Sequence, residues 1–228
     1  MVWGILGALD AEIALIREQM EIEKQEDRFG TTFYFGTVHG KPVVLACCGV
    51  GKVNAAVCAA YVLGTCGADC VVNVGIAGAM KPGLHMLDVV ISEEVGFHDQ
   101  DTVMLNYYPK RAFFQADSAL AALCDRACAE IPRLSGKYLH GRIASGDQFV
   151  SETAVKQSIN ERYAPACVEM EGAAVGHAAF MYEKPFLVIR TMSDAADDDA
   201  DETYDNFIDE AAKTSAEIIL HMLALAEQ

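Results

Sequence analysis

The sequence predicts an α/β protein whose central sheet is mostly parallel and is flanked by helices. Short apolar runs alternate with helical patterns over the whole length, which is the order found in sheets with crossover helices. Acidic residues follow directly after several of these runs, at the edge of a parallel sheet where ligands bind. The length of 228 residues lies within the range of one large domain, and we expect a single domain over residues 1–228.

Strands are expected wherever a short apolar run occurs. They cover residues 2–8, 32–38, 42–48, 70–75, 88–94, 139–144, 166–168 and 185–192. The second and third runs are joined by only three residues, His39, Gly40 and Lys41, a spacing that favours an antiparallel hairpin. The central sheet should therefore be mixed.

Helices are expected between these strands. They cover residues 10–20, 52–66, 118–130, 171–182 and 203–226. In the first, Ile13, Ile16 and Met20 recur at three- and four-residue spacing, which is typical of one buried helix face. The last keeps an apolar side from Phe207 to Leu225. Both helices should pack against the sheet.

Composition and charge exclude several classes of protein. The net charge is −16 and no cluster of Lys and Arg interrupts it, so nucleic acid should be repelled. No apolar stretch reaches the roughly 18 residues that a membrane span needs. The first expected strand begins at residue 2, which leaves no room for an export signal. We expect a cytoplasmic protein that binds neither nucleic acid nor membranes.

The eight cysteines are interpreted as small buried thiols. Cys66 and Cys70 are four residues apart, as are Cys124 and Cys128, but no His lies near either pair to complete a zinc site. The acidic stretch 194–202 lacks the alternating ligands and central Gly of a calcium loop and is expected to be a solvated loop. The sequence therefore predicts no metal.

Two glycine-rich segments follow expected strands. Residues 49–52, Gly-Val-Gly-Lys, suggest a phosphate loop, but position 46 is Ala where Gly is required and position 53 is Val where Ser or Thr is required. Residues 75–78, Gly-Ile-Ala-Gly, follow the next strand. We interpret both as places where the backbone approaches another backbone or a flat ligand.

Carboxylates stand at the ends of three expected strands, and they carry the functional argument. Glu12 follows the first strand, Glu169 and Glu171 follow the run ending at Val168, and Asp194 follows the last strand. Each could be an ordinary capping or surface acid. Buried acids are costly unless they are used or paired, so together they suggest proton chemistry on a small polar substrate.

Seven segments carry a resemblance to a known family. They are residues 4–8 with Glu12, 49–56, 73–78, 98–99, 145–149, 168–171 and 193–194. In order and spacing they resemble the 5′-methylthioadenosine/S-adenosylhomocysteine nucleosidases of the nucleoside phosphorylase superfamily. The resemblance implies a nucleoside phosphorylase-like, three-layer α/β/α fold with a central mixed sheet. It also implies a homodimer that binds a small-molecule nucleoside and uses no metal or organic cofactor.

The resemblance implies roles for individual residues. Glu12 corresponds to the base that activates the attacking water, and Asp194 to the acid that protonates the purine at N7. Glu171 corresponds to the acid that grips the ribose hydroxyls beside Met170. These roles agree with the chemistry of ribose–purine cleavage, in which one acid must hold a proton while another stays ionised.

Further residues are implied around the substrate. Phe149 matches the ring that stacks on the base, Val150 the residue whose backbone reads the adenine edge, and Arg190 an arginine near the water site. The other candidates for substrate contact are Val50, Ile76, Ala77, Glu169 and Ser193.

Two departures from the family affect the expected pocket. Ile76 stands where the family often has Ser, which removes a hydroxyl near the sugar. The loop 100–114 is short and rich in Met, Leu, Tyr and Phe, and we expect it to enclose the 5′ group of the substrate and to contribute to the dimer.

Two other functions remain open at this point. A phosphorylase would need several arginines around its phosphate, and Asn73 stands where phosphorylases tend to carry one of them. A binding protein without turnover is the other alternative, although it would not need an acid at both ends of the scissile bond.

Overall fold

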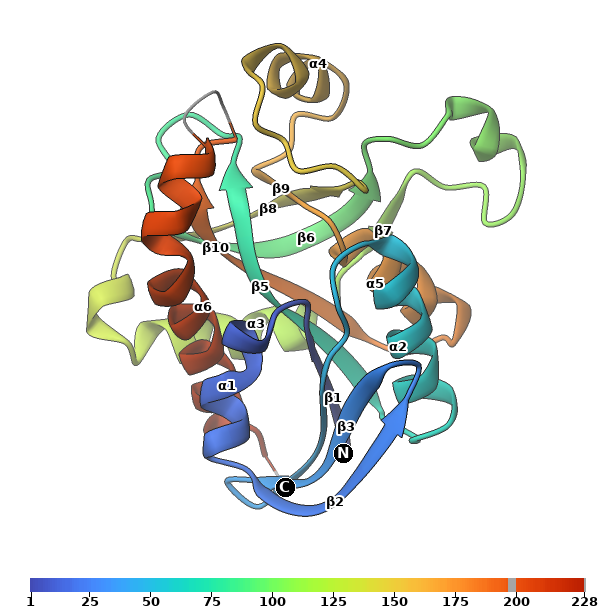
Figure 1. Cartoon of the computed structure of the whole chain (residues 1–228), viewed down its shortest axis with the longest axis vertical. Helices are drawn as coiled ribbons and strands as arrows, with labels where there is room; N and C mark the ends of the chain where they lie inside the picture. The colour runs from blue at the N-terminus through green and yellow to red at the C-terminus, as the bar shows by residue number, and fades with distance from the viewer. Residues whose placement is uncertain (197–199, 228) are drawn as a thin grey trace.

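The computed structural model describes residues 1–196 and 200–227, and its centre is a sheet of ten strands (Figure 1). The strands are β1 (Trp3–Gly7), β2 (Glu21–Arg28), β3 (Thr31–Val38), β4 (Lys41–Cys47), β5 (Cys70–Ala79), β6 (Val89–Phe97), β7 (Phe113–Gln115), β8 (Tyr138–Ser145), β9 (Cys167–Glu169) and β10 (Phe186–Asp194). The helices are α1 (Asp10–Glu18), α2 (Lys52–Gly64), α3 (Ser118–Ala129), α4 (Thr153–Tyr163), α5 (Gly172–Met181) and α6 (Ala200–Leu225), with short 3₁₀ turns η1 (Thr102–Asn106) and η2 (Pro132–Leu134).

The sheet is mixed, as predicted, and one half of it closes on itself. Strands β4, β1, β5 and β10 lie side by side and parallel, and β3 joins β4 as the expected antiparallel hairpin. Strand β10 also pairs with β6, and β6 leads through β8 and β9 back to β5. Because β10 has a partner on both sides, the carboxyl ends of β5 and β10 are held at a fixed separation.

Helices cover both faces of the sheet. Helices α2 and α5 contact each other on one side, while α1 and α3 pack against α6 on the other (Figure 1). Successive residues of β1 enter different cores, since Ile5 packs with the α1 and α6 side and Leu6 with the α2 and α5 side. A strand buried on both faces is a continuous apolar run, which is why the alternation of elements could be predicted.

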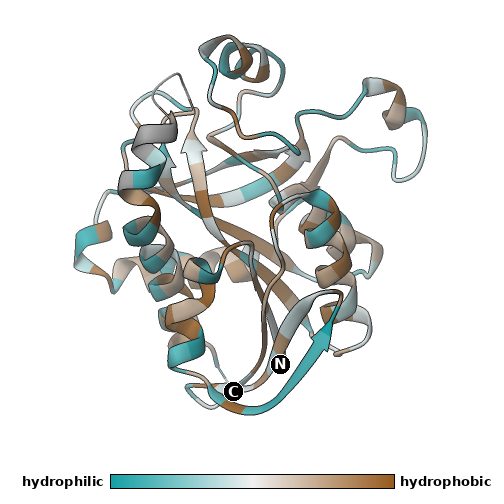
Figure 2. Cartoon of the chain, in the orientation of Figure 1, coloured by the Kyte–Doolittle hydropathy of each residue, from teal (hydrophilic) through white to brown (hydrophobic). Residues whose placement is uncertain are grey.

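The structure adds elements that the sequence did not predict. Strand β2 has the sequence EIEKQEDR and is hydrophilic apart from Ile22 (Figure 2), so it offers no apolar run. Helix α4 is similarly polar, with only Ile159 buried. Strands β5 and β10 also run to Ala79 and Asp194, beyond the expected ends at residues 75 and 192.

The loop expected to form a lid is only partly exposed. Tyr107 and Tyr108 at its tip are 63% and 68% exposed. Phe114 lies in the core as part of β7, and Phe113 lies under the guanidinium of Arg142. The two phenylalanines therefore anchor the loop, which corrects the expectation that they belong to its apolar surface.

Three further sequence-based expectations concern the cysteines, membrane spans and the acidic stretch. All eight cysteines are free thiols, six of them buried. Within the described residues, no helix combines the length and the apolar character that crossing a membrane requires. The acidic stretch 194–202 contains residues 197–199, which lie outside the described part of the chain, so the expected solvated loop stays a prediction.

Candidate active site

The carboxylates predicted from the sequence meet in one cavity of about 110 Å³. Glu12 comes from the first turn of α1, Glu171 from the residue before α5, and Asp194 from the end of β10. The lining also contains the predicted residues Val50, Ile76, Ala77, Phe149, Glu169, Met170 and Ser193. Ligand pockets usually have at least about 300 Å³, so a ligand of that size would extend from this cavity onto the exposed side chains of Val50 and Phe149.

Glu12 is buried and held by three backbone amides. Its Oε2 accepts hydrogen bonds from the amides of Ala8 (2.6 Å) and Leu9 (2.9 Å), and its Oε1 accepts one from Ile76 (3.0 Å). The bond to Leu9 also caps α1, so capping and a functional role coexist here. Burial raises the pKa of the Glu12 carboxyl, and Arg190 and the three amides oppose the rise.

Asp194 is aimed into the cavity by an irregularity in β10. Met192 pairs with Ala77 and Asp194 with Gly78, so Ser193 is an extra residue between them. Such bulges redirect side chains beside active sites. The Asp194 carboxylate, 2% exposed, accepts hydrogen bonds from Ser193 Oγ (2.9 Å) and the Ala196 amide (2.8 Å).

Two glycines in β5 make room for these carboxylates. A Cβ at Gly75 would lie 2.4 Å from Glu12 Oε1, and a Cβ at Gly78 would lie 2.6 Å from Asp194 Oδ1. No side chain fits at such distances. The sequence-based interpretation expected a backbone or a flat ligand beside these glycines, whereas at Gly75 and Gly78 the missing side chain leaves room for a carboxylate of the protein.

Glu171 is connected to the glycine-rich segment 49–52. Its Oε1 accepts a hydrogen bond from the Gly51 amide at 2.8 Å, so this backbone donor faces a carboxylate of the protein itself. Burial and the neighbouring Glu169 raise the pKa of Glu171 to about 7, although Arg190 and Gly51 favour its ionised form.

Glu169, which lines the cavity, forms a buried ion pair with Arg190. Glu169 also accepts hydrogen bonds from Ser145 Oγ and from the amides of Glu171 and Gly172 at the start of α5. The guanidinium of Arg190 bonds to the side chain and carbonyl of Asn73. Arg190 is not part of the cavity lining, so its contacts hold Glu169 and the strand ends in place.

The lining also contains an aromatic residue that the sequence analysis missed. Tyr204, on α6, lines the cavity, and its ring meets Phe149 edge-on with centroids 5.5 Å apart. The expected apolar side of this helix began at Phe207, so no periodic signal selected Tyr204. Val150, predicted to read the base edge, is buried beside the cavity and is not part of its described lining.

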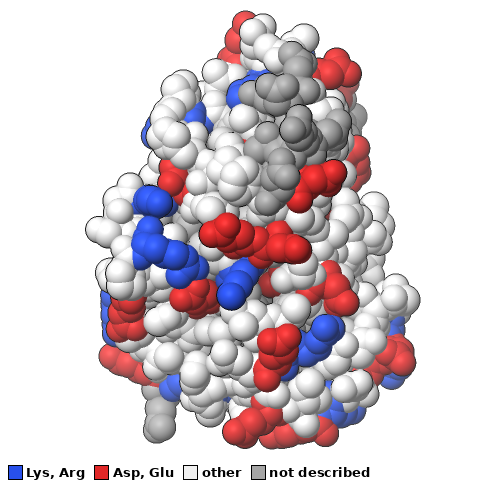
Figure 3. All heavy atoms as spheres, turned by 60° about the vertical axis from the view of Figure 1, so that its left-hand side comes forward, with Lys and Arg blue, Asp and Glu red and all other residues white. Residues whose placement is uncertain are grey.

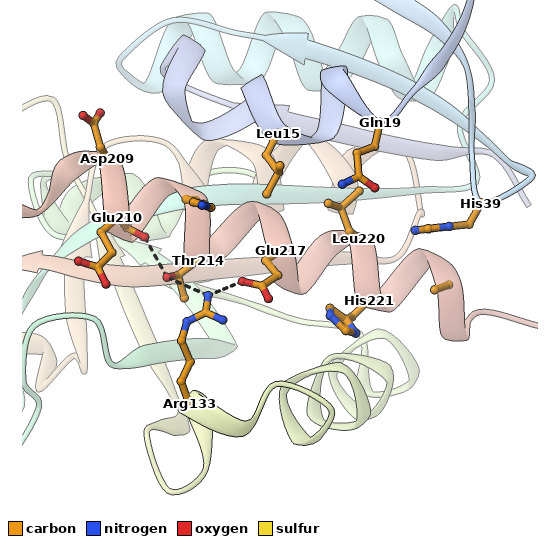
Figure 4. Close-up of a pocket in the computed structure, with 12 residues that line it drawn as sticks. Leu15, Gln19, His39, Arg133, Asp209, Glu210, Thr214, Glu217, Leu220 and His221 are labelled. Atoms are coloured by element: carbon orange, nitrogen blue, oxygen red, sulfur yellow. Dashed lines mark hydrogen bonds and ion pairs between the residues drawn. The ribbon is translucent and has the colours of Figure 1, made fainter.

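A larger hollow lies away from the carboxylates. This groove of about 960 Å³ runs between α1 and α6 and includes Arg133 of η2 (Figure 4). Arg133 pairs with Glu217 and contacts Thr214 Oγ1. The groove contains none of the residues predicted for the site.

Comparisons with known proteins find relatives that match nearly the whole chain. The model of the phosphorylase superfamily matches residues 3–224. A 5′-methylthioadenosine/S-adenosylhomocysteine nucleosidase from Aeromonas salmonicida is 38% identical over 226 residues, which cover 96% of this chain and 97% of the relative. The nucleosidase of Neisseria meningitidis, solved with methylthio-immucillin-A, has a TM-score of 0.93 and 36% identity, with 99% of both chains covered. The futalosine hydrolase of Helicobacter pylori has a TM-score of 0.90 and 29% identity, with 98% of this chain and 97% of that chain covered.

The fold and the family model define an α/β enzyme of the phosphorylase superfamily. Within this superfamily, the chain belongs to the 5′-methylthioadenosine/S-adenosylhomocysteine nucleosidase family. It is a nucleosidase, that is, an N-glycosyl hydrolase. The fold class and the family predicted from the sequence are thus confirmed.

Proposed function

We propose that the enzyme hydrolyses the N-ribosidic bond of 5′-substituted adenosines and releases adenine and the 5′-substituted ribose. The candidate substrates are methylthioadenosine, S-adenosylhomocysteine and 5′-deoxyadenosine. The observation that carries the proposal is the convergence of Glu12, Glu171 and Asp194 on one cavity.

In the proposed mechanism, Asp194 and Glu12 act on opposite ends of the breaking N-ribosidic bond. Asp194 protonates the purine at N7, so that adenine leaves as a neutral base and not as an anion. Glu12 takes a proton from the water that attacks the sugar carbon, and its negative charge stabilises the oxocarbenium-like sugar. The raised pKa of Glu12 makes this carboxylate a stronger base.

The remaining residues bind and orient the substrate. Glu171 accepts hydrogen bonds from the ribose hydroxyls beside Met170, Phe149 stacks on the purine, and the Val150 backbone reads the adenine edge. Arg190 acts by holding Glu169 and the strand ends behind these groups. This reaction needs no metal or organic cofactor, since water is the nucleophile and protein carboxyls move the protons.

The charge of the cavity supports hydrolysis over phosphorolysis. The described residues that line it include three Glu, one Asp and no Lys, Arg or His. Asn73 is buried and donates to the Leu6 carbonyl, and Arg190 is engaged by Asn73 and Glu169. A phosphate dianion would meet carboxylates without a cationic partner.

The oligomeric state and compartment belong to the same proposal. An apolar groove of about 590 Å³ runs along α2 and α5, with exposed Val53, Val57 and Met181, and it supports a homodimer. The partner's 102–108 loop would then enclose the 5′ group. Eight free cysteines support a reducing, cytoplasmic location.

One assay tests the reaction and the substrate class. The purified protein is incubated with methylthioadenosine, S-adenosylhomocysteine, 5′-deoxyadenosine, adenosine and futalosine, each with and without phosphate. Free 5′-substituted ribose formed without phosphate supports the proposal. Formation of a sugar 1-phosphate, or preferential cleavage of futalosine, would overturn it.

A further inference from the structure

Lys52, Asp99 and Asp147 form an ionic cluster beside the cavity. We infer that this cluster is a positioning device that fixes Glu171 relative to the loop carrying Phe149, and that catalysis depends on it. The inference rests on the proposed function, because it assigns Glu171 and Phe149 to the two halves of one nucleoside.

The cluster joins three segments that are distant in the sequence. Lys52 Nζ lies 2.6 Å from Asp99 Oδ2 and 3.4 Å from Asp147 Oδ2. The Asp147 amide donates to Asp99 Oδ2 at 3.0 Å, and the Lys52 amide donates to Asp147 Oδ1 at 2.8 Å. The start of α2, the end of β6 and the loop after β8 are therefore cross-linked by both side chains and backbone.

Gly51 links the cluster to the ribose side of the site. Its amide donates to Glu171 Oε1, while the next amide, that of Lys52, donates to Asp147. Gly51 has φ +99°, a conformation that side chains rarely allow, and a Cβ there would lie 3.1 Å from Asp147 Oδ1. A movement of Asp147 would consequently displace the Gly51 donor from Glu171.

Asp147 links the cluster to the base side. It stands two residues before Phe149 and three before Val150, and its carboxylate is held by the first amide of α2, where a negative charge is favoured. Phe149 is 41% exposed and packs on Tyr204 alone among the described rings. The position of the Phe149 ring therefore depends on the hydrogen bonds that hold its loop at Asp147.

The environment of the cluster separates it from an ordinary surface ion pair. The side chains of Lys52 and Asp99 are about one-quarter exposed, and Lys52 Nζ lies 5.7 Å from the centroid of the Phe97 ring. Burial raises the pKa of Asp99, but the hydrogen bonds from Lys52 and the Asp147 amide lower it below its ordinary value. The Asp147 side chain is half exposed, and ion pairs with such exposure contribute little to stability, so we assign the cluster a geometric role.

The test compares Lys52→Met with Lys184→Met. Methionine keeps the apolar stem of lysine and removes its charge. Lys184 is the matched control because it also pairs with an aspartate, Asp69, and is 37% exposed. With methylthioadenosine, Lys52→Met should lower kcat/KM about 10- to 100-fold, the cost of a small misplacement of catalytic groups. Lys52→Arg should recover most of the activity, and Lys184→Met should stay within about twofold of the wild type.

A double-mutant comparison shows whether Lys52 acts through Glu171. If it does, Lys52→Met should cost less than about threefold in a Glu171→Ala background, in which residue 171 can no longer accept from Gly51. The pH profile gives a second measurement: loss of the Gly51 donor raises the pKa of Glu171, so the acidic limb of kcat/KM should move to higher pH. Glu169, Arg190 and Glu12 also act on this carboxyl and are unchanged in both variants. Additive losses with an unmoved pH limb would overturn the inference.

Amide hydrogen exchange separates this inference from the proposed function. In Lys52→Met without substrate, the amides of Gly51 and Lys52 should exchange faster than in Lys184→Met. If the wild type hydrolyses no nucleoside, the proposed function is wrong, and exchange still decides whether the cluster holds these amides. If the wild type is active and Lys52→Met matches Lys184→Met in rate and exchange, only the inference is wrong.

Discussion

At the scale of single residues, the site depends on acids of one chemical type in different surroundings. Glu12 and Glu171 are buried close to each other, and burial raises the pKa of both. Asp194 instead accepts from a hydroxyl and an amide at the bulge. The environment of each acid, more than its identity, assigns its proposed role.

The first prediction tests Asp194 as the proton donor. Asp194→Asn should lower kcat for methylthioadenosine by about 10²–10⁴-fold, because an amide cannot supply the N7 proton. Binding of methylthio-immucillin-A, measured by calorimetry, should be retained. Asp209→Asn is the control, because Asp209 is an exposed acid that lines the large groove between α1 and α6, away from the cavity. A loss of less than tenfold would contradict the role.

The second prediction uses the linkage between the pKa of Glu171 and stability. The folded pKa of about 7 lies above the ordinary value of 4.5. Between these pH values the folded state keeps a proton that the unfolded state loses, so the wild type loses stability as pH rises from about 4.5 to 7. Each pKa unit corresponds to about 1.4 kcal/mol. Glu171→Gln should therefore be more stable than the wild type at pH 8 and should lose this advantage at pH 4.

Urea unfolding at the two pH values measures this difference. The amide oxygen of Gln can still accept from Gly51, so the comparison isolates the charge. An advantage of the variant that is equal at pH 4 and pH 8 would show that Glu171 is not the titrating group.

At the scale of elements, the carboxyl ends of β5 and β10 shape the site together. The bulge at Ser193 turns Asp194 toward β5, and Gly78 in β5 leaves the space into which Asp194 fits. Gly75 does the same for Glu12. Strands β5 and β10 were each predicted from an apolar run. They fit together because β10 has the extra residue Ser193 and β5 has no side chain at Gly78.

The third prediction tests this fit. Gly78→Ala should reduce kcat at least tenfold because its methyl group displaces Asp194, and misplaced catalytic groups cost about 10²-fold in rate. The same change in an Asp194→Asn background should have little further effect on kcat. Gly136→Ala, whose added Cβ would meet nothing within 4 Å although its φ is +72°, is the control for a methyl group added where it contacts no neighbour, and it should keep full activity. Full activity of Gly78→Ala would contradict the proposed fit.

The extent of prediction from sequence also follows from the elements. Strands β1, β5 and β10 could be predicted because burial on both faces leaves continuous apolar runs, and Glu12, Glu171 and Asp194 because each follows such a run. Strand β2 could not be predicted from an apolar run, since its stability comes from pairing with β3. The Lys52 cluster depends on contacts 47 and 95 residues apart, which no local pattern encodes.

At the scale of the whole molecule, the surface separates regions of different character. On the face shown in Figure 3, basic side chains lie singly or in small groups among acidic ones, in line with the net charge of −16. The groove along α2 and α5 is instead mainly apolar. We therefore expect self-association to use α2 and α5.

The fourth prediction tests this surface. Val57→Glu, a change at a residue 40% exposed on α2, should convert the proposed homodimer into a monomer, because a charge would be buried in an apolar interface. Sedimentation at micromolar concentration measures the change. Ile22→Glu on β2, at a residue 39% exposed, is the matched control and should leave the dimer intact. A monomeric wild type, or a dimeric Val57→Glu protein, would contradict the prediction.

The polar strand β2 has a consequence for how the protein behaves at high concentration. It pairs with β3 on one side only, so its other side carries backbone donors and acceptors that a second sheet could use. Lys24, Glu26 and Arg28 form ion pairs along it, and charged side chains on such an edge oppose edge-to-edge aggregation. Strand β10 is protected from aggregation because both of its sides are paired, with β5 and with β6. Strand β2 has one unpaired side, and its charged side chains protect that side instead.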